Sequence, residues 1–218
     1  MFNVEKATND CIQWIRDWRE ENGPGCNLIV GISGGVDSLV AAELCVEAVG
    51  ADKVLGVIMP NYKQDDIDVA YDICQHVLGI DYLTINVGSA YDDIIDQIDA
   101  AFNVTDQTLI NLAPRLRMAT LYGVSQSRNG RVVNTCNLSE DWVGYSTRYG
   151  DAAGDFAPLA QFTKGEVKSI GYYLDLPKKY IEKTPSDGLC GKSDEDNFGF
   201  TYAILDSCLL YTSDAADE

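Results

Sequence analysis

The stretch SGGVDS, residues 33–38, places two glycines, two hydroxyls and one acid at a single turn. It follows the apolar run CNLIVGI at 26–32 and opens an amphipathic helical pattern at 38–49. A strand that passes through such a turn into a helix gathers backbone N–H groups and a helix N-terminus at one point, which is the arrangement that binds phosphate. Gly34 and Gly35 let the backbone approach a ligand closely because they lack a Cβ. The stretch therefore predicts a phosphate-binding loop.

Asp37 within this loop has two interpretations. A carboxylate beside phosphates is explained by a divalent cation between them, and Mg²⁺ is commonly held by one or two carboxylates plus phosphates. Alternatively, Asp37 caps its own helix. The double-glycine turn favours the metal site. The Walker A pattern is absent, because GLCGKS at 188–193 has too short a glycine spacing and no apolar strand before it.

The strands and helices that position this loop can be predicted from the alternation of apolar patterns. Short apolar runs predict strands at 26–32, 53–59, 81–87 and 131–135. Helical periodicity predicts a first helix that ends near residue 22 and further helices at 38–49, about 65–78 and about 106–127. The pattern is again helical from residue 160 onward. This alternation indicates an α/β fold with a doubly wound parallel sheet and helices on both faces.

Composition limits the classes of function. A chain of 218 residues with 46% apolar residues fits one domain of ordinary size, and the formal net charge of −18 argues against a nucleic-acid partner. No apolar stretch is long enough to span a membrane and no signal-peptide pattern is present, so we expect a cytoplasmic protein with no membrane partner. The seven scattered cysteines predict buried free thiols, and the single histidine, His76, predicts a partly exposed residue on a helix.

The string SGGVDS after a strand resembles the pyrophosphate-binding loop of the N-type ATP pyrophosphatases. Residues 111–167, which include NLAPRLRM, NTCNLSE, STRYGDAAGD and FTKGEV, together with KTPSDGLCGKSDEDNFGFTY at 183–202, resemble the ammonia-dependent NAD synthetases. With the loop, the resemblance covers about residues 5–207. It implies an adenine nucleotide alpha hydrolase-like fold and a ligase that uses ATP, Mg²⁺ and ammonia to convert deamido-NAD to NAD through an adenylated carboxylate, with release of AMP and pyrophosphate.

The resemblance also implies the roles of individual residues. The expected ATP site consists of Gly31, Ile32, Ser33, Gly34, Gly35, Val36, Asp37, Ser38, Thr135, Lys164 and Ser186. The expected metal ligands are Asp37 and Glu140, the expected catalytic residues are Asp37 and Lys164, and the expected deamido-NAD ligands are Arg115, Arg148 and Asp155. Glu140 could instead be an acid on a surface helix. Of Arg115 and Arg117, which face apart on a helix, one could bind the ligand while the other makes a structural ion pair.

Two features depart from the family pattern. Arg148 replaces a more usual lysine, which keeps the charge but changes its geometry. Residues 208–218, CLLYTSDAADE, match the translation of a transposase adapter used in sequencing libraries. We therefore expect residues 1–207 to be a C-terminally truncated catalytic domain and 208–218 to be non-native, with an ordinary acidic terminus as the alternative. Because the family has a further C-terminal segment that contacts deamido-NAD, we expect this chain to bind that substrate weakly.

The resemblance also raises alternative functions and implies an oligomeric state. Enzymes of tRNA thiolation and GMP synthetases share the loop, but a tRNA enzyme needs a basic surface and catalytic cysteines. An inactive nucleotide-binding fragment is a further alternative. Family members are homodimers, and the helical pattern at 106–127 could supply the interface, although packing against the sheet would explain its apolar positions equally well.

Overall fold

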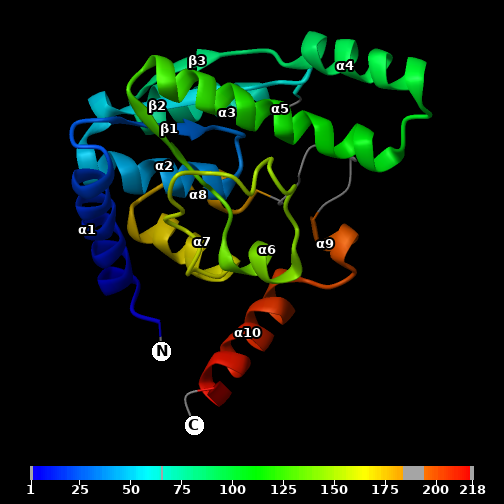
Figure 1. The fold of residues 1–218 in the computed structure, drawn as a ribbon. Helices are drawn as coiled ribbons and strands as arrows, with labels where there is room; N and C mark the ends of the chain where they lie inside the picture. The colour runs from blue at the N-terminus through cyan, green and yellow to red at the C-terminus, as the bar shows by residue number, and fades with distance from the viewer. Residues whose placement is uncertain (1, 65, 184–193, 217–218) are drawn as a thin grey trace.

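A parallel sheet organises the chain in a computed structural model that describes residues 2–64, 66–183 and 194–216 (Figure 1). The strands are β1 (Asn27–Gly31), β2 (Val54–Ile58), β3 (Asp81–Thr84) and β4 (Gly130–Val133), in the order β3-β2-β1-β4. In the central strand, Ile29 pairs with Leu55 of β2 and with Val132 of β4. The strand order reverses at β1, because the chain moves from β1 to β2 and β3 and then returns to add β4 on the other side. Ligands of open α/β sheets bind at the carboxyl ends of strands at such a reversal.

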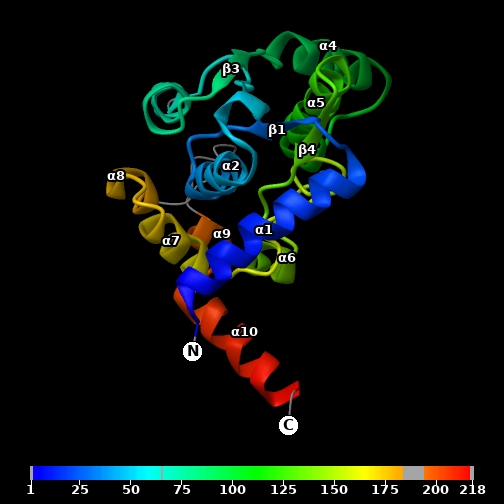
Figure 2. The ribbon, with the colours of Figure 1, turned by 90° about the vertical axis from the view of Figure 1, so that its left-hand side faces the viewer.

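Helices cover both faces of this sheet, as the sequence predicted (Figures 1 and 2). They are α1 (Val4–Asn22), α2 (Val36–Val49), α3 (Ile67–Asp72), α4 (Gly88–Ala101), α5 (Asp106–Ser127), α6 (Leu138–Val143), α7 (Lys164–Tyr173), α8 (Lys178–Ile181), α9 (Asp194–Phe198) and α10 (Tyr202–Ala216). A 3₁₀ turn, η1 (Ala51–Lys53), precedes β2, and a π-helical turn, η2 (Ile73–Val77), follows α3.

Successive residues of β1 enter two different cores. Leu28 and Val30 join a large cluster that includes buried residues of α1, α2 and α7. Ile29 joins a smaller cluster, against which Leu116 and Leu121 of α5 pack. Because side chains alternate along a strand, this division places α1, α2 and α7 on one face and α5 on the other.

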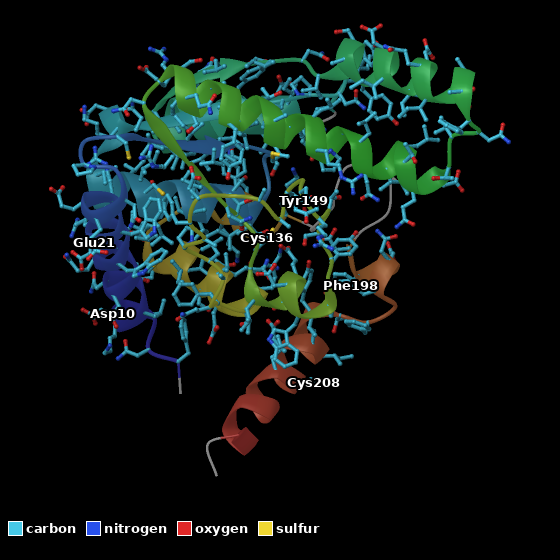
Figure 3. All side chains as sticks on the ribbon, in the orientation of Figure 1. Asp10, Glu21, Cys136, Tyr149, Phe198 and Cys208 are labelled. Atoms are coloured by element: carbon cyan, nitrogen blue, oxygen red, sulfur yellow. The ribbon has the colours of Figure 1, made fainter. Side chains whose placement is uncertain are left out.

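The structure differs from the sequence-based expectations in three places. Residues 88–101 form α4, which the sequence analysis did not predict, and α4 buries only Gly88. The helix expected over about 65–78 changes to π geometry at Ile73. Cys208 is exposed on α10, which corrects the prediction that every cysteine is buried (Figure 3). The described cysteines at 11, 26, 45, 74 and 136 are buried free thiols, and Cys190 lies outside the described residues.

The last helix, α10, projects from the rest of the fold (Figures 1 and 2). Its first turns are anchored by Tyr202, Leu205 and Leu209, which form a small cluster with Leu138 and Phe198. The helix runs through the predicted junction at Ser207 without a break. Among the residues that the structure describes, no helix is both long enough and apolar enough to cross a lipid bilayer.

Candidate active site

The predicted phosphate loop lies between the end of β1 and the start of α2. Gly34 has a φ of +86°, a conformation that favours glycine, and the Ser33 hydroxyl accepts a hydrogen bond of 3.2 Å from the Gly35 amide. The Ser38 hydroxyl donates to the Gly35 carbonyl at 3.0 Å. Gly35 occupies the N-cap position of α2 and supplies no side-chain cap, so the first N–H groups of a 14-residue helix keep their capacity to bind an anion.

Asp37 does not cap its helix, which removes the alternative raised from the sequence. Its Oδ2 accepts a hydrogen bond of 2.6 Å from Lys164 Nζ, and its Oδ1 accepts one of 3.0 Å from Asn137 Nδ2. Both partners follow β4 in the chain, whereas Asp37 follows β1. The contacts therefore join the two strand ends at the point where the strand order reverses.

Glu140 lies at the same point, and the alternative of a surface acid is wrong. Its Oε1 is 3.1 Å from Lys164 Nζ, and its side chain is only 14% exposed. Asn137 and Glu140 form a reciprocal capping box at the start of α6, and this box fixes the direction in which Glu140 leaves the helix. Lys164 begins α7 after a second capping box, formed by Thr163 and Glu166, and its side chain is 3% exposed.

Three charged groups thus share one buried position. Burial, together with the charge of Asp37, raises the pKa of Glu140 to about 7, while the charge of Lys164 opposes this rise. Burial disfavours the charged form of Lys164, but the charges of Asp37 and Glu140 outweigh this effect and raise its pKa. The ammonium of Lys164 is therefore held as a cation between two carboxylates.

This arrangement fits Mg²⁺ by the chemistry of its donors. Two carboxylates converge on one point that already accommodates a cation, and Mg²⁺ prefers oxygen ligands. The described residues contain no cluster of three or more candidate metal ligands. A metal here would take its remaining ligands from water and from substrate phosphates, which is the usual case for Mg²⁺ at nucleotide sites.

The C-terminal part of the chain supports this site, which the sequence analysis did not anticipate. The Tyr202 hydroxyl lies 3.3 Å from Glu140 Oε1, and its ring lies 4.9 Å from Lys164 Nζ. Asp206 accepts hydrogen bonds from the Ser139 hydroxyl at 2.5 Å and from the Gly165 amide at 2.9 Å. Asp206 therefore ties the start of α6 to the start of α7. The position of Asn137 was detectable, because Asn-x-x-Glu before a helix is a capping-box pattern.

Two of the three expected deamido-NAD residues lie together. Arg115 Nε donates a hydrogen bond of 3.3 Å to the carbonyl of Arg148, and both side chains are exposed. Asp155 accepts a hydrogen bond of 2.7 Å from the Val132 amide, so it secures the edge of β4. Arg117 donates a hydrogen bond of 2.9 Å to the Met59 carbonyl. Of the two arginines, Arg117 therefore has the structural contact, and Arg115 is the exposed one.

Of the two remaining residues expected to contact ATP, the structure describes only one. Thr135 follows the carboxyl end of β4 and is half-buried, near the buried Cys136 that Figure 3 labels. Ser186 lies outside the described residues. The ATP-contacting roles of Thr135 and Ser186 stay predictions.

A parallel sheet with a double-glycine loop before α2, and with carboxylates from α2 and α6 that meet at one lysine, is the architecture of nucleotide-binding enzymes of the adenine nucleotide alpha hydrolase-like fold. Residues 7–218 match the model of a family described as NAD synthase. The chain belongs to the NAD synthase family.

Relatives of the chain agree with this assignment. The NH(3)-dependent NAD(+) synthetase of Thermococcus kodakarensis is 41% identical over 95% of this chain and 81% of its own length. The enzyme of the same name from Carboxydothermus hydrogenoformans is 39% identical over 99% of this chain and 89% of its own. The expected class of enzyme, an ammonia-dependent NAD synthetase and thus a ligase, is confirmed, and the rival functions are not favoured.

Solved structures give the same fold. The NMN synthetase of Francisella tularensis superposes with a TM-score of 0.87 at 34% identity, covering 96% of this chain and 87% of that one. An NH3-dependent NAD synthetase of Campylobacter jejuni superposes with a TM-score of 0.76 at 32% identity, covering 84% of this chain and 78% of that one.

Proposed function

We propose that the chain joins ammonia to the nicotinate carboxylate of deamido-NAD at the expense of ATP, with Mg²⁺ held by Asp37 and Glu140. The observation that carries this proposal is the convergence of both carboxylates on Lys164 beside the phosphate loop. Mg²⁺ bound there would neutralise phosphate charge and orient the triphosphate. The N–H groups in the first turn of α2, from Val36 to Ser38, would hold the same phosphates.

The chain's residues would then assist two displacements. The substrate carboxylate attacks the α-phosphorus of ATP, the bond between that phosphorus and the bridging oxygen breaks, and pyrophosphate leaves. A fixed cation such as Lys164 stabilises the charge that develops on this leaving group. Ammonia next attacks the acyl carbon, the C–O bond to AMP breaks, and the nitrogen loses a proton. Ammonia is itself a nucleophile, so the second step requires no catalytic triad.

The proposed activity can be tested by its products. Incubation with ATP, Mg²⁺, deamido-NAD and ammonium should give NAD, AMP and pyrophosphate in equal amounts. Release of ADP, or absence of ATP cleavage by the intact reading frame, would contradict the proposal. Replacing ammonium with glutamine should abolish the reaction, because the proposed nucleophile is free ammonia.

The similarity to an NMN synthetase supports a second candidate substrate. Amidation of nicotinate mononucleotide would use the same chemistry on the same carboxylate, without the adenylate half of the dinucleotide. Parallel assays with the mononucleotide and the dinucleotide would distinguish them by kcat/KM. We expect the dinucleotide to be preferred, since the more numerous sequence relatives are named NAD(+) synthetases.

We also propose that the enzyme is a homodimer and that α4 and α5 supply the interface. Of the 22 residues of α5, only Ala113, Pro114 and Ser125 are buried. Packing against the sheet explains Leu116 and Leu121 but leaves Ile110 45% exposed, and Phe102, just after α4, is 73% exposed. Exposed apolar side chains concentrated on neighbouring elements are typical of an interface.

Residues 208–218 remain, in our proposal, a translated adapter, which is supported by the match along the whole stretch. A natural gene that continues after Ser207 with unrelated residues would support this proposal, whereas a natural gene that encodes the same eleven residues and then a stop would refute it. Titration of deamido-NAD against this chain and against the intact form would show whether the predicted truncation weakens substrate binding. Equal affinity would contradict that expectation.

A further inference from the structure

Asn137 contacts both of the carboxylates assigned to the metal site. Its Nδ2 donates to Asp37 Oδ1 at 3.0 Å, and its backbone N–H donates to Glu140 Oε2 at 3.4 Å. Its Oδ1 accepts from the Glu140 amide at 3.1 Å. Asn137 is fully buried, so each of these contacts is shielded from water.

The two carboxylates use their oxygens in the same way. Asp37 turns Oδ1 to Asn137 and Oδ2 to Lys164, and Glu140 turns Oε2 to Asn137 and Oε1 to Lys164. One oxygen of each acid is therefore fixed by Asn137, while the other points to a shared position that holds a cation. The Asn137 side chain holds the Asp37 carboxylate directly, whereas it holds Glu140 through the capping box, in which the backbone N–H of Asn137 donates to Glu140 Oε2.

We propose that Asn137 is a positioning residue that aims Asp37 Oδ2 and Glu140 Oε1 at one metal ion. This inference rests on the proposed function, because it requires that the two acids bind the metal. It goes further in assigning to Asn137 a role beyond the capping of α6. The capping role uses Oδ1, whereas the contact with Asp37 uses Nδ2, so the two roles can be separated by mutation.

Asn137→Ser makes this separation. Serine is about as good an N-cap as asparagine, but its hydroxyl is too short to replace the amide donor at Asp37. Asn3→Ser is the matched control, because Asn3 caps α1 through its contact with the Lys6 amide. Asn137→Ala removes both the cap and the donor. Melting temperature and circular dichroism of each variant establish that it is folded.

Metal affinity is measured without turnover by titrating Mn²⁺ in the presence of α,β-methylene-ATP. This analogue cannot be cleaved between its α- and β-phosphates. Free Mn²⁺ is followed by electron paramagnetic resonance. We expect Asn137→Ser and Asn137→Ala to weaken Mn²⁺ binding by about 10-fold or more, as is typical when a partner of a metal ligand is removed. Asn3→Ser should bind Mn²⁺ like the wild type, and only Asn137→Ala should show a further loss of melting temperature.

The outcomes separate this inference from the proposed function. If Asn137→Ser binds Mn²⁺ as tightly as the wild type, the positioning role is overturned and Asn137 is only a helix cap. This holds whether or not Asn137→Ala binds Mn²⁺ more weakly. Should only one of the two variants fold, unchanged Mn²⁺ affinity in that variant would equally overturn it. Failure of the wild-type chain to bind Mn²⁺ with the nucleotide analogue would instead overturn the proposed metal site, and the role of Asn137 with it.

Discussion

Lys164 donates a hydrogen bond of 2.6 Å to Asp37, a residue 127 positions earlier in the chain, and its ammonium also lies 3.1 Å from Glu140. The ammonium thus occupies the position on which both proposed metal ligands converge. A divalent cation that enters without nucleotide must either share this position with a positive charge or displace it. Nucleotide phosphates would give Lys164 an alternative anionic partner.

Replacement of Lys164 by methionine is therefore expected to have opposite effects on metal binding and catalysis. Lys164→Met should tighten the binding of Mn²⁺ alone by about 10-fold or more, because a positive charge that competes for the two carboxylates is removed from a site of reduced dielectric. The same variant should lower kcat by about 100-fold or more, because the fixed cation at the leaving group is lost. Lys168→Met, four residues further along α7, is the control and should change neither quantity. Weaker Mn²⁺ binding in Lys164→Met would contradict the competition.

The two arginines of α5 should fail in different ways when each is replaced by alanine. Arg115 is exposed beside Arg148, so Arg115→Ala should raise KM for deamido-NAD by about 10-fold through loss of a charged contact, with little change in melting temperature. Arg117 binds the Met59 carbonyl, so Arg117→Ala should lower the free energy of unfolding by about 1–2 kcal/mol. Steady-state kinetics and urea unfolding of both variants test this division. Equal changes in KM for the two variants would contradict it.

Glu43 on α2 should make the protein less stable as the pH rises. Burial, aided by the charge of Glu47, raises the pKa of Glu43 from 4.5 to about 7. The folded state therefore binds this proton more tightly than the unfolded state, and the resulting stabilisation, complete below pH 4.5, is lost as the pH rises through about 7.

Glu43→Gln removes this pH dependence. At pH 8 it should raise the free energy of unfolding by about 1–2 kcal/mol, which is less than the full shift would give because the side chain keeps some contact with solvent. At pH 4.5 it should have little effect. Urea unfolding at both pH values measures the difference, with Glu20→Gln on α1, an exposed residue, as the control. A benefit of the same size at both pH values would argue against the raised pKa.

A charge placed on the exposed face of α5 should dissociate the proposed dimer. Ile110→Asp changes a side chain that is 45% exposed, so the monomer should stay folded while light scattering after size exclusion shows half the wild-type mass. Ile204→Asp on α10 is the matched control, since Ile204 is 57% exposed and α10 projects away from α4 and α5 (Figures 1 and 2). A monomeric wild-type protein, or a dimeric Ile110→Asp variant, would contradict this interface.

Some elements could be predicted because their signals are local. The apolar run before SGGVDS predicts β1, and the glycines predict the turn into α2, since strand, turn and helix lie within about twenty consecutive residues. The periodicity of residues 106–127 gives α5 with the bounds that the structure shows. By contrast, the sequence analysis missed α4, although Tyr91, Ile94, Ile95 and Ile98 recur at helical spacing there.

By itself, the sequence determined the phosphate loop, the alternation of strands and helices, and the set of residues that could carry the chemistry. Only the tertiary structure decided which of them meet. Asp37, Glu140 and Lys164 share one point because β4 returns to pair with β1, which brings together chain segments more than a hundred residues apart. The contacts of Asn137, Tyr202 and Asp206 depend on that arrangement too, because contacts between residues far apart in sequence are set by strand order and helix packing.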